Sequence, residues 1–273
     1  MPEGPEIRRA ADRIEAVLKS QRVEKIVFGL PRLEQHQKFF TDTRVLGIET
    51  RGKALLTHFD NALSIYSHNQ LYGVWRIVRR DQFPNTRRQL RLAIHTHQHS
   101  ALLYSASDIS VWESSRIEEH PFLSRIGPDI LSPNLQWRDV AERLRSPTFR
   151  NRALSSVYLD QAFLAGLGNY LRSEILFSAG VHPSKKAREL TRGQVGKLAR
   201  ATLKVAQQSY ATGGVIVSER DYKASRAKGV THGQSRFFVF ARASKPCRVC
   251  KTKIQRSSAN SRRIYVCHKC QPV

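Results

Sequence analysis

The chain has 273 residues, and its 46 Lys and Arg residues against 22 Asp and Glu give a formal net charge of +24. An apolar share of 40% is enough for a hydrophobic core and argues against general disorder. No apolar run approaches the roughly 18 residues of a membrane-spanning helix, and the N-terminus does not resemble a secretory signal. A charge surplus of this size predicts a phosphate-rich partner, either nucleic acid or an anionic membrane surface.

The positive charge is unevenly distributed along the chain. Residues 185–273 hold 21 Lys and Arg but only 3 acids, whereas residues 1–184 hold 25 against 19. The net charges are therefore +18 and +6, which indicates a nearly balanced N-terminal part and a basic C-terminal part.

The N-terminal part alternates between one helical pattern and many short β patterns. Apolar residues recur at helical spacing over residues 5–19, which predicts an amphipathic helix. Leu90, Leu92 and Ile94 alternate with polar or small neighbours, as on a half-buried strand. Many short strands at this spacing predict a β-sandwich with the first helix packed beside it. The expected strands cover residues 23–28, 44–49, 54–59, 63–66, 74–78, 90–94, 101–104 and 109–112.

Helical patterns dominate after a connector of Pro and Gly residues at 121–133. Thr191 and Gln194 occupy the positions of a capping box at the start of the longest pattern. Residues 212–234 are rich in Gly, Lys and Arg with weak periodicity, which predicts a mobile loop, and residues 236–240 return to strand character. The expected helices cover residues 138–145, 148–157, 169–179 and 191–210.

All four cysteines lie close to the C-terminus, in two Cys-x2-Cys pairs separated by 16 residues. This clustering differs from the spread of a disulfide-stapled secreted protein and fits tetrahedral thiolate coordination of one structural zinc ion. Residues 252–255 and 263–266 are expected to form a β-hairpin between the pairs. The hairpin would hold Arg256, Arg262 and Arg263 for phosphate contact. The predicted ligands are Cys247, Cys250, Cys267 and Cys270.

A second set of possible metal ligands is His95, His97 and His99, which alternate along the chain. Alternating histidines can chelate a metal from one face of a strand. A solvated strand end is the ordinary interpretation of the same pattern.

The second and third residues, Pro2 and Glu3, suggest covalent chemistry. Removal of Met1 would expose the secondary amine of Pro2, and an α-amino group titrates near roughly pH 8, so much of it is neutral and nucleophilic in the cell. Such an amine can attack a sugar C1′ carbon and form a Schiff base, while Glu3 can protonate the sugar or the leaving base. The alternative is a common Met-Pro start followed by a glutamate that only compensates a helix dipole.

Several stretches occur together in one order and carry a resemblance. They are Met1–Ile7, Arg51–Phe59, Ser67–Gly73, Asp160–Glu174 and the four-cysteine hairpin. With them, the sequence resembles the formamidopyrimidine-DNA glycosylase/endonuclease VIII family over essentially its whole length. Within that family it is most similar to the bacterial endonuclease VIII branch, on account of residues 51–59 and 67–73.

The resemblance implies a two-domain α+β fold: an N-terminal β-sandwich flanked by a helix, then a helical domain with a helix–two-turn–helix motif and a β-hairpin zinc finger. The implied boundaries are residues 1–125 for the catalytic sandwich, 126–235 for the DNA-binding helical domain with its mobile loop at 212–234, and 236–273 for the zinc finger.

The resemblance also implies a bifunctional DNA glycosylase/AP lyase and assigns its catalytic residues. Pro2 matches the Schiff-base nucleophile, Glu3 the neighbouring acid and Lys53 the β-turn lysine. Glu6 and Glu174 match further carboxylates of the family, and either of them could mainly orient the site.

Other residues match the family's DNA contacts. The helix–two-turn–helix motif falls on residues 154–177, where Asn169 and backbone amides at a helix start would hold a phosphate. The zinc-finger arginine falls on Arg262, and Arg263 beside it leaves the assignment between the two open.

Gln70, Leu71 and Tyr72 suit a third task, because a base must leave its stack before an enzyme can act on it. An apolar side chain and a ring can fill the gap while the amide meets the orphan base, and the resemblance assigns this role to the three residues. The alternative is that Leu71 and Tyr72 are ordinary core residues.

The expected substrates are oxidised bases in double-stranded DNA, mainly pyrimidines such as thymine glycol, and abasic sites. After the base leaves, β,δ-elimination would cut the strand. Residues 212–234 depart from the endonuclease VIII pattern, so a preference for oxidised purines, as in the formamidopyrimidine branch, stays open. A monomer in the bacterial cytoplasm, associated with the nucleoid and not with a membrane, is expected.

Two rival interpretations remain. A non-enzymatic basic zinc-ribbon protein that binds nucleic acid accounts for the net charge and the cysteines but gives no role to Pro2, Glu3 or Asn169. A family member that senses damage without catalysis is disfavoured by the intact Pro2, Glu3 and Lys53.

Overall fold

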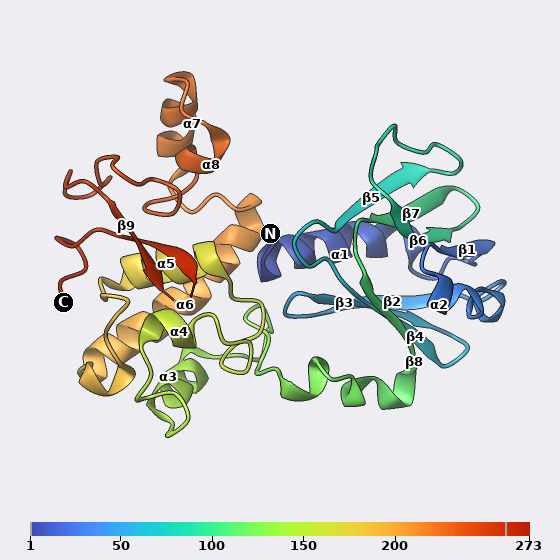
Figure 1. Cartoon of the computed structure of the whole chain (residues 1–273), viewed down its shortest axis with the longest axis horizontal. Helices are drawn as coiled ribbons and strands as arrows, with labels where there is room; N and C mark the ends of the chain where they lie inside the picture. Colours follow the sequence, from blue (N-terminus) through green and yellow to red (C-terminus); the bar gives the residue numbers. More distant parts are fainter. Residues whose placement is uncertain (1, 260) are drawn as a thin grey trace. The chain divides into compact units, whose positions relative to one another are not determined.

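The structure is a computed structural model that describes residues 2–259 and 261–273. The chain divides into two compact units (Figure 1). The N-terminal tripeptide Glu3–Pro5 belongs with the C-terminal unit. No helix in the described part is both long and apolar enough to span a membrane. The first unit comprises Pro2 and Glu6–Arg125, and the second comprises Glu3–Pro5 and Ile126–Val273.

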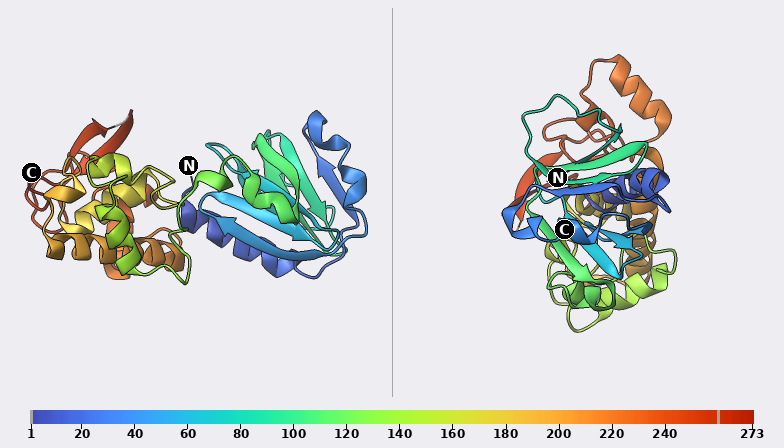
Figure 2. Two further views of the ribbon diagram at one scale, coloured as in Figure 1. Left: turned by 90° about the horizontal axis from the view of Figure 1, so that it is seen from below. Right: turned by 90° about the vertical axis from the view of Figure 1, so that its right-hand side faces the viewer.

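The first unit is a β-sandwich of two antiparallel four-stranded sheets, as predicted (Figure 2). One sheet has the order β1-β6-β7-β5 and the other β2-β3-β4-β8. All eight expected strands are present, each within a few residues of its expected bounds. They are β1 (Lys25–Phe28), β2 (Val45–Arg51), β3 (Ala54–Phe59), β4 (Leu63–His68), β5 (Val74–Arg79), β6 (Leu90–His95), β7 (His99–Tyr104) and β8 (Asp108–Glu113).

The core of this unit lies between the sheets and under helix α1 (Gly4–Leu18). Ile7, Ile14 and Leu18 of α1 pack with buried residues of both sheets, as the helical spacing predicts. Short helical turns complete the unit: α2 (Pro31–Glu34), η1 (Gln37–Phe39), η2 (Ser114–Glu119) and η3 (Leu123–Arg125).

The second unit is built on a buried helix, α5 (Asn169–Ala179), which packs against the long helix α6 (Arg192–Thr212). Both match their predicted ranges closely, and Thr191 caps α6 by accepting a hydrogen bond from the Gln194 amide. The unit also contains α3 (Trp137–Arg145), α4 (Leu154–Val157), η4 (Ala187–Glu189), α7 (Glu219–Ala227), α8 (His232–Ser235), β9 (Gln255–Ala259) and β10 (Arg262–Val266).

The helix expected over residues 148–157 is wrong in its first half, since only α4 forms there. The amides of Leu154 and Ser155 donate to the carbonyls of Lys185 and Pro183, and Ala153 forms a β-bridge with Lys186. Long-range pairing therefore takes the donors that a longer helix would have used.

The expectation of a loop without helices at 212–234 is also wrong, because α7 and α8 lie within it. Ser218 accepts a hydrogen bond from the Asp221 amide, and Thr231 accepts one from the Gln234 amide. These residues are N-caps, which compensate for the poor apolar pattern.

Two strand predictions near the cysteines need correction. Residues 236–240 form no strand, since the amides of 238–240 donate to the Glu174 carboxylate instead of a neighbouring strand. The first hairpin strand is 255–259 and not 252–255, because Thr252 and Ile254 bond backbone groups around Cys247.

Candidate functional site

The carboxylate of Glu3 is buried on the N-terminus of α5. Its Oε1 accepts a hydrogen bond from the Tyr170 amide at 2.9 Å, and its Oε2 accepts one from the Leu171 amide at 3.2 Å. These amides belong to the first turn of the helix, where backbone donors have no partner within the helix and the dipole favours an anion. Glu3 is only 2% exposed, so its position is determined by the protein and not by solvent.

The turn before α5 is shaped to receive this N-terminal segment. The Gly4 amide donates to the Gly166 carbonyl at 2.8 Å. A Cβ atom on Gly168 would lie 2.3 Å from the Glu3 Cδ, so only glycine leaves room for the carboxylate. Gln161 ties the turn together, because its side chain donates to the Leu167 carbonyl and accepts from the Gly166 amide.

This arrangement limits which groups at the helix start can make the predicted phosphate contact. The amides of Tyr170 and Leu171 are committed to Glu3, so they are not the donors expected to hold a phosphate. The Asn169 side chain remains the candidate for that contact.

Asn169 is held by a buried arginine of the same helix. Arg172 donates to the Asn169 Oδ1 at 2.6 Å, to the Ser155 carbonyl at 2.9 Å and to the Arg263 carbonyl at 3.1 Å. Burial lowers the pKa of Arg172 to about 10; the charge of Glu3 opposes this shift and that of Arg262 adds to it. One guanidinium thus joins α4, α5 and β10.

Arg262 and Arg263 are both exposed on β10. As neighbours on a strand, their side chains point to opposite faces.

Glu174 is fully engaged within the second unit. Its Oε1 accepts hydrogen bonds from the amides of Val239 and Phe240, and its Oε2 accepts one from the Phe238 amide. Burial raises the pKa of Glu174, and the three amide donors and Arg242 oppose this. The side chain therefore fixes the 238–240 turn.

The other predicted catalytic residues lie in the first unit. Lys53 is buried in the turn between β2 and β3, where Gly52 adopts a left-handed φ of 65°. Glu6 lies in the first turn of α1, and Pro2 is half-buried just before that helix.

The four cysteines converge on one point, with all sulfur atoms within 4.8 Å of one another. The Cys250 and Cys267 sulfurs are 3.3 Å apart, and those of Cys247 and Cys270 are 3.9 Å apart. Sulfurs around a tetrahedral zinc ion are spaced by about 3.8 Å, given a Zn–S distance of about 2.3 Å. The cluster can therefore hold one metal ion in all-sulfur coordination.

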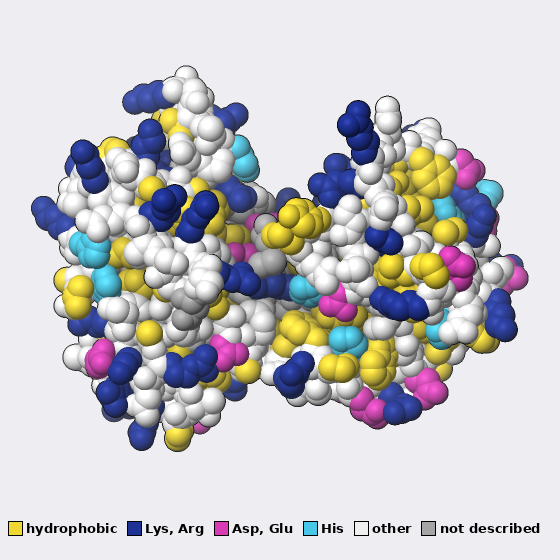
Figure 3. Space-filling model, in the orientation of Figure 1, with side chains coloured by type: hydrophobic (Ala, Val, Ile, Leu, Met, Phe, Trp, Pro, Cys, Tyr) yellow, Lys and Arg dark blue, Asp and Glu magenta, His cyan; other side chains and the backbone are white. Residues whose placement is uncertain are grey.

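Arg248, inside the first Cys-x2-Cys pair, connects the cysteine cluster to α7 and α8. It donates to the Ser225 hydroxyl, to the carbonyl of Phe237 and to those of Gln234 and Ser235. No residue of α7 is buried. Lys and Arg side chains gather over this segment, at the top left of Figure 3.

The loop between β4 and β5 exposes the predicted wedge residues, with 55% of Leu71 and 69% of Tyr72 accessible. The alternative that they are core residues is therefore wrong. A Cβ on Gly73 would lie 2.4 Å from the Asn69 carbonyl oxygen, and Gln70 adopts a left-handed φ of 51°. The loop is thus a tight turn that presents two apolar side chains to solvent.

The histidine alternative finds no support. His95 is buried at the end of β6 with its Nδ1 on the Ser100 hydroxyl, and His97 is exposed in the turn that follows. Among residues 2–259 and 261–273, the cysteines form the one cluster with metal-ligand geometry.

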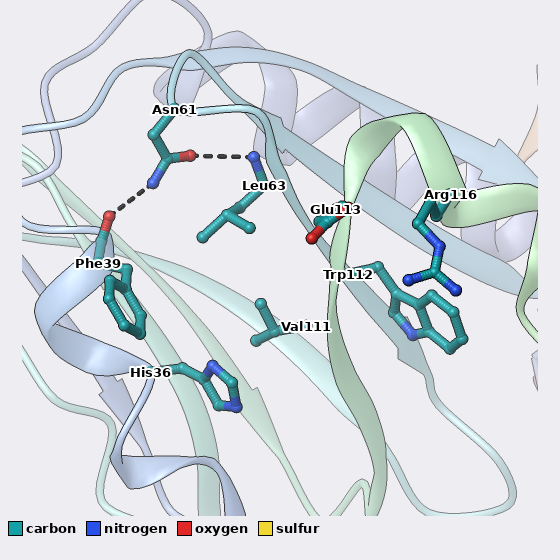
Figure 4. A pocket seen from close by; sticks show the side chains of 8 residues that line it. All are labelled: His36, Phe39, Asn61, Leu63, Val111, Trp112, Glu113 and Arg116. Carbon is teal, nitrogen blue, oxygen red and sulfur yellow. Dashed lines mark hydrogen bonds between the residues drawn. The ribbon is translucent and has the colours of Figure 1, made fainter.

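A hollow of about 610 Å³ beside β8 contains none of the predicted site residues (Figure 4). Asn61 organises one edge, since its Nδ2 donates to the Phe39 carbonyl and its Oδ1 accepts from the Leu63 amide. Arg116, at the opposite edge, pairs with Glu119.

Sequence reasoning missed the roles of Arg172, Arg248 and Gly168. Arg172 follows Asn169 by three residues, so helical spacing places both on one face. Arg248 lies within a metal-binding turn, which fixes its backbone. No local signal reveals Gly168, since the atoms that crowd it belong to Glu3, 165 positions earlier in the sequence.

Two family descriptions match the chain. Residues 1–107 match the formamidopyrimidine-DNA glycosylase N-terminal domain, and residues 126–221 match the helix–two-turn–helix domain of the same glycosylase.

Relatives and solved structures agree with these matches. Endonuclease 8 of Escherichia coli strain K12 is 47% identical, with 99% of this chain and 100% of the relative covered; the Shigella sonnei protein gives the same values. Lactococcus lactis formamidopyrimidine-DNA glycosylase bound to abasic-site DNA has a similar fold, with a TM-score of 0.81 at 20% identity over 99% of this chain and all of that one. The chain therefore belongs to the formamidopyrimidine-DNA glycosylase/endonuclease VIII family of DNA glycosylases.

Proposed function

We propose that this protein is a bifunctional DNA glycosylase and AP lyase of base excision repair. The observation that carries the proposal is the fixed Glu3 carboxylate, buried on the α5 amides next to the only proline that can become the N-terminal residue. A nucleic-acid-binding protein without chemistry would have no need to bury an acid at this position.

The Glu3 carboxylate is placed so that it can accept a proton from Pro2 and return it later in the reaction. The Pro2 amine attacks C1′ of the damaged nucleotide, and its proton passes to the ionised Glu3, whose two oxygens both act as acceptors. Glu3 then returns the proton to the sugar ring oxygen as the C1′–O4′ bond opens, and the C1′–base bond breaks with the base leaving as an anion that takes its proton from water. The iminium left on Pro2 acidifies the neighbouring sugar protons, so β- and then δ-elimination cut the strand, and water releases Pro2.

DNA binding is assigned to groups of both units. Lys53, the Nδ2 group of Asn169 and Arg262 would contact backbone phosphates, with Arg263 as the alternative to Arg262. Gln70, Leu71 and Tyr72 would fill the space left by the flipped base. Glu6 and Glu174 are proposed to orient these groups, since Glu174 spends its oxygens on three amides.

We assign one structural zinc ion to Cys247, Cys250, Cys267 and Cys270. All-sulfur coordination leaves no open position for substrate, so the ion would stabilise the hairpin that carries Arg262 and take no part in the chemistry.

We propose oxidised pyrimidines in double-stranded DNA as the main substrates, a preference that is consistent with the endonuclease 8 name of the relatives. Oxidised purines remain the alternative within the family, since α7 and α8 add a basic segment that the sequence pattern of endonuclease VIII does not predict. We further propose that the protein acts as a monomer at the bacterial nucleoid.

Borohydride trapping tests the proposal. The purified protein, with its Pro2 terminus verified by mass, is mixed with duplexes that contain thymine glycol, an oxidised guanine or an abasic site. We expect a covalent adduct that is strongest for thymine glycol and the abasic site, and peptide mapping by mass should place it on the Pro2 nitrogen. Absence of any adduct, with DNA binding retained, would favour the non-enzymatic zinc-ribbon alternative.

A further inference from the structure

A hollow of about 550 Å³ lies beside the wedge loop in the first unit. Gln70 and Tyr72 of the loop contribute to its wall, together with three arginines that precede and enter β6. No carboxylate contributes to this wall. The other lining residues are Gln89, Ser105, Ala106 and Ser107, and the arginines are Arg87, Arg88 and Arg91.

The three arginines are not neutralised by the protein. Within the described residues, none of them forms an ion pair. Arg87 and Arg88 are exposed, whereas Arg91 donates to the Gly29 carbonyl and to the Gln89 side chain, and its Nε is buried without a hydrogen-bond partner in that part of the chain. Guanidinium donors gathered without an acid make a site for an oxyanion, because charge-assisted hydrogen bonds to phosphate are strong and can be bidentate.

Arg88 also links this hollow to the wedge. Its Nη1 donates to the Tyr72 carbonyl at 2.6 Å, while the Ser107 hydroxyl donates to the Gln70 Oε1 at 2.9 Å. A guanidinium has five N–H donors, so one bond to Tyr72 leaves others for a ligand. An anion held by Arg88 would therefore steady the loop that carries Leu71 and Tyr72.

We propose that Arg87 and Arg88 bind a backbone phosphate of the undamaged DNA strand, with the positive charge of Arg91 beside them in the same hollow. The proposal rests on the proposed function, in which Gln70 meets the orphan base of that strand. Because Gln70 forms part of the same hollow, the phosphate beside the orphan base is the one within reach. This site would bind the undamaged strand, in addition to the phosphate contacts proposed for Asn169, Arg262 and Lys53 around the lesion.

Neutral phosphate analogues can locate this contact. Duplexes with a tetrahydrofuran abasic analogue carry a single methylphosphonate at successive positions of either strand, and dissociation constants are measured for the wild type, for Arg87→Ala and for Arg13→Gln. Arg13 is an exposed arginine of α1 away from the hollow, so it serves as the matched control.

In the wild type and in Arg13→Gln, we expect one or two positions near the orphan base on the undamaged strand to weaken binding about tenfold when neutralised. In Arg87→Ala, neutralising the same phosphates should not weaken DNA binding any further. The slope of log K against log salt should also fall by about 0.9 per lost contact. The proposal is wrong if neutralising these phosphates still weakens DNA binding by Arg87→Ala. It is also wrong if Arg87→Ala removes only the effect of methylphosphonates on the damaged strand.

A second measurement distinguishes absence of the arginine site from absence of the Pro2 chemistry. Borohydride trapping on a single-stranded abasic oligonucleotide needs the Pro2 chemistry but no undamaged strand. An adduct without the methylphosphonate coupling overturns the arginine site alone, whereas no adduct from a verified Pro2 terminus overturns the enzyme.

Discussion

Two short loops that carry proposed functional residues are built in opposite ways. The turn of residues 166–169 is buried and held by many hydrogen bonds, to Gly4, to Gln161 and through the helix start to Glu3. The wedge loop of residues 69–73 exposes its apolar side chains, and hydrogen bonds from Arg88 and Ser107 hold its backbone and the polar side chain of Gln70. A group that moves protons must be fixed within a fraction of an ångström, whereas a wedge needs free apolar surface that can enter a base stack.

The largest expected effect comes from Gly168→Ala, which disturbs the fixed turn without removing any polar group. The new Cβ would lie 2.3 Å from the Glu3 Cδ, so the carboxylate must move. A displacement of this kind costs on the order of 100-fold in rate. Single-turnover excision of thymine glycol should show this loss, while the dissociation constant for abasic-analogue DNA stays nearly unchanged.

Gly193→Ala is the control for that substitution, because the nearest atom to its Cβ is 4.0 Å away. If Gly168→Ala excises within about threefold of the wild-type rate, the placement of Glu3 by this turn is not what limits catalysis.

Glu174→Gln extends the test to the second buried carboxylate. One amide N–H of residues 238–240 would then face the glutamine NH2 group and lose its acceptor. We expect the free energy of unfolding to fall by about 2 kcal/mol in denaturant titrations. An unchanged midpoint would mean that this turn relaxes at no cost.

Arg248→Ala should loosen the α7–α8 segment, which has hydrogen bonds to Arg248 but almost no buried apolar residues. Its local opening free energy should fall by about 1–2 kcal/mol, seen as faster amide exchange and tryptic cleavage at Arg226 and Lys228. Arg256→Ala, at an exposed hairpin arginine, should leave both unchanged. Equal protection in the two variants would contradict the role of Arg248.

Leu71→Ala tests the role of the exposed wedge loop. Loss of the exposed side chain should slow excision from duplex DNA about tenfold, because the vacated stack is filled less well. Cleavage of a single-stranded abasic site should not change, since no stack has to be opened. Leu46→Ala, at a leucine of β2 with 58% exposure, is the control and should have no effect on either rate.

The smallest effect concerns the pH dependence of the wedge loop. The Nδ1 of His68 accepts a hydrogen bond from the Gln70 amide, which requires a neutral ring. Burial lowers the pKa of His68 below 6.5; the Asp108 charge opposes this, and Lys53 lowers it further. The stabilisation is therefore complete above pH 6.5 and is lost as the pH falls through the folded-state pKa.

We expect this contribution to be below about 1 kcal/mol. His68→Gln should flatten the pH dependence of unfolding between about pH 7 and pH 5 relative to the wild type. A parallel pH dependence in both proteins would show that His68 keeps one charge state in this range.

Periodic features and features that depend on neighbouring residues could be predicted from the amino-acid sequence alone. Alternation in strands such as Leu90–His95 and the stripe of α1 predicted the sandwich, because one buried face is enough to impose each pattern. The Cys-x2-Cys pairs predicted their cluster, since each tight turn places its own two sulfurs together.

Features in which a distant group competes for backbone donors could be seen only in the folded structure. Residues 236–240 have the composition of a strand, but Glu174 takes their amides. From the sequence, the backbone amides at the start of α5 were expected to bind phosphate. In the structure, two of them donate hydrogen bonds to Glu3 instead. Propensity cannot foresee either outcome, because a buried carboxylate outweighs local preference and its partners lie far away along the chain.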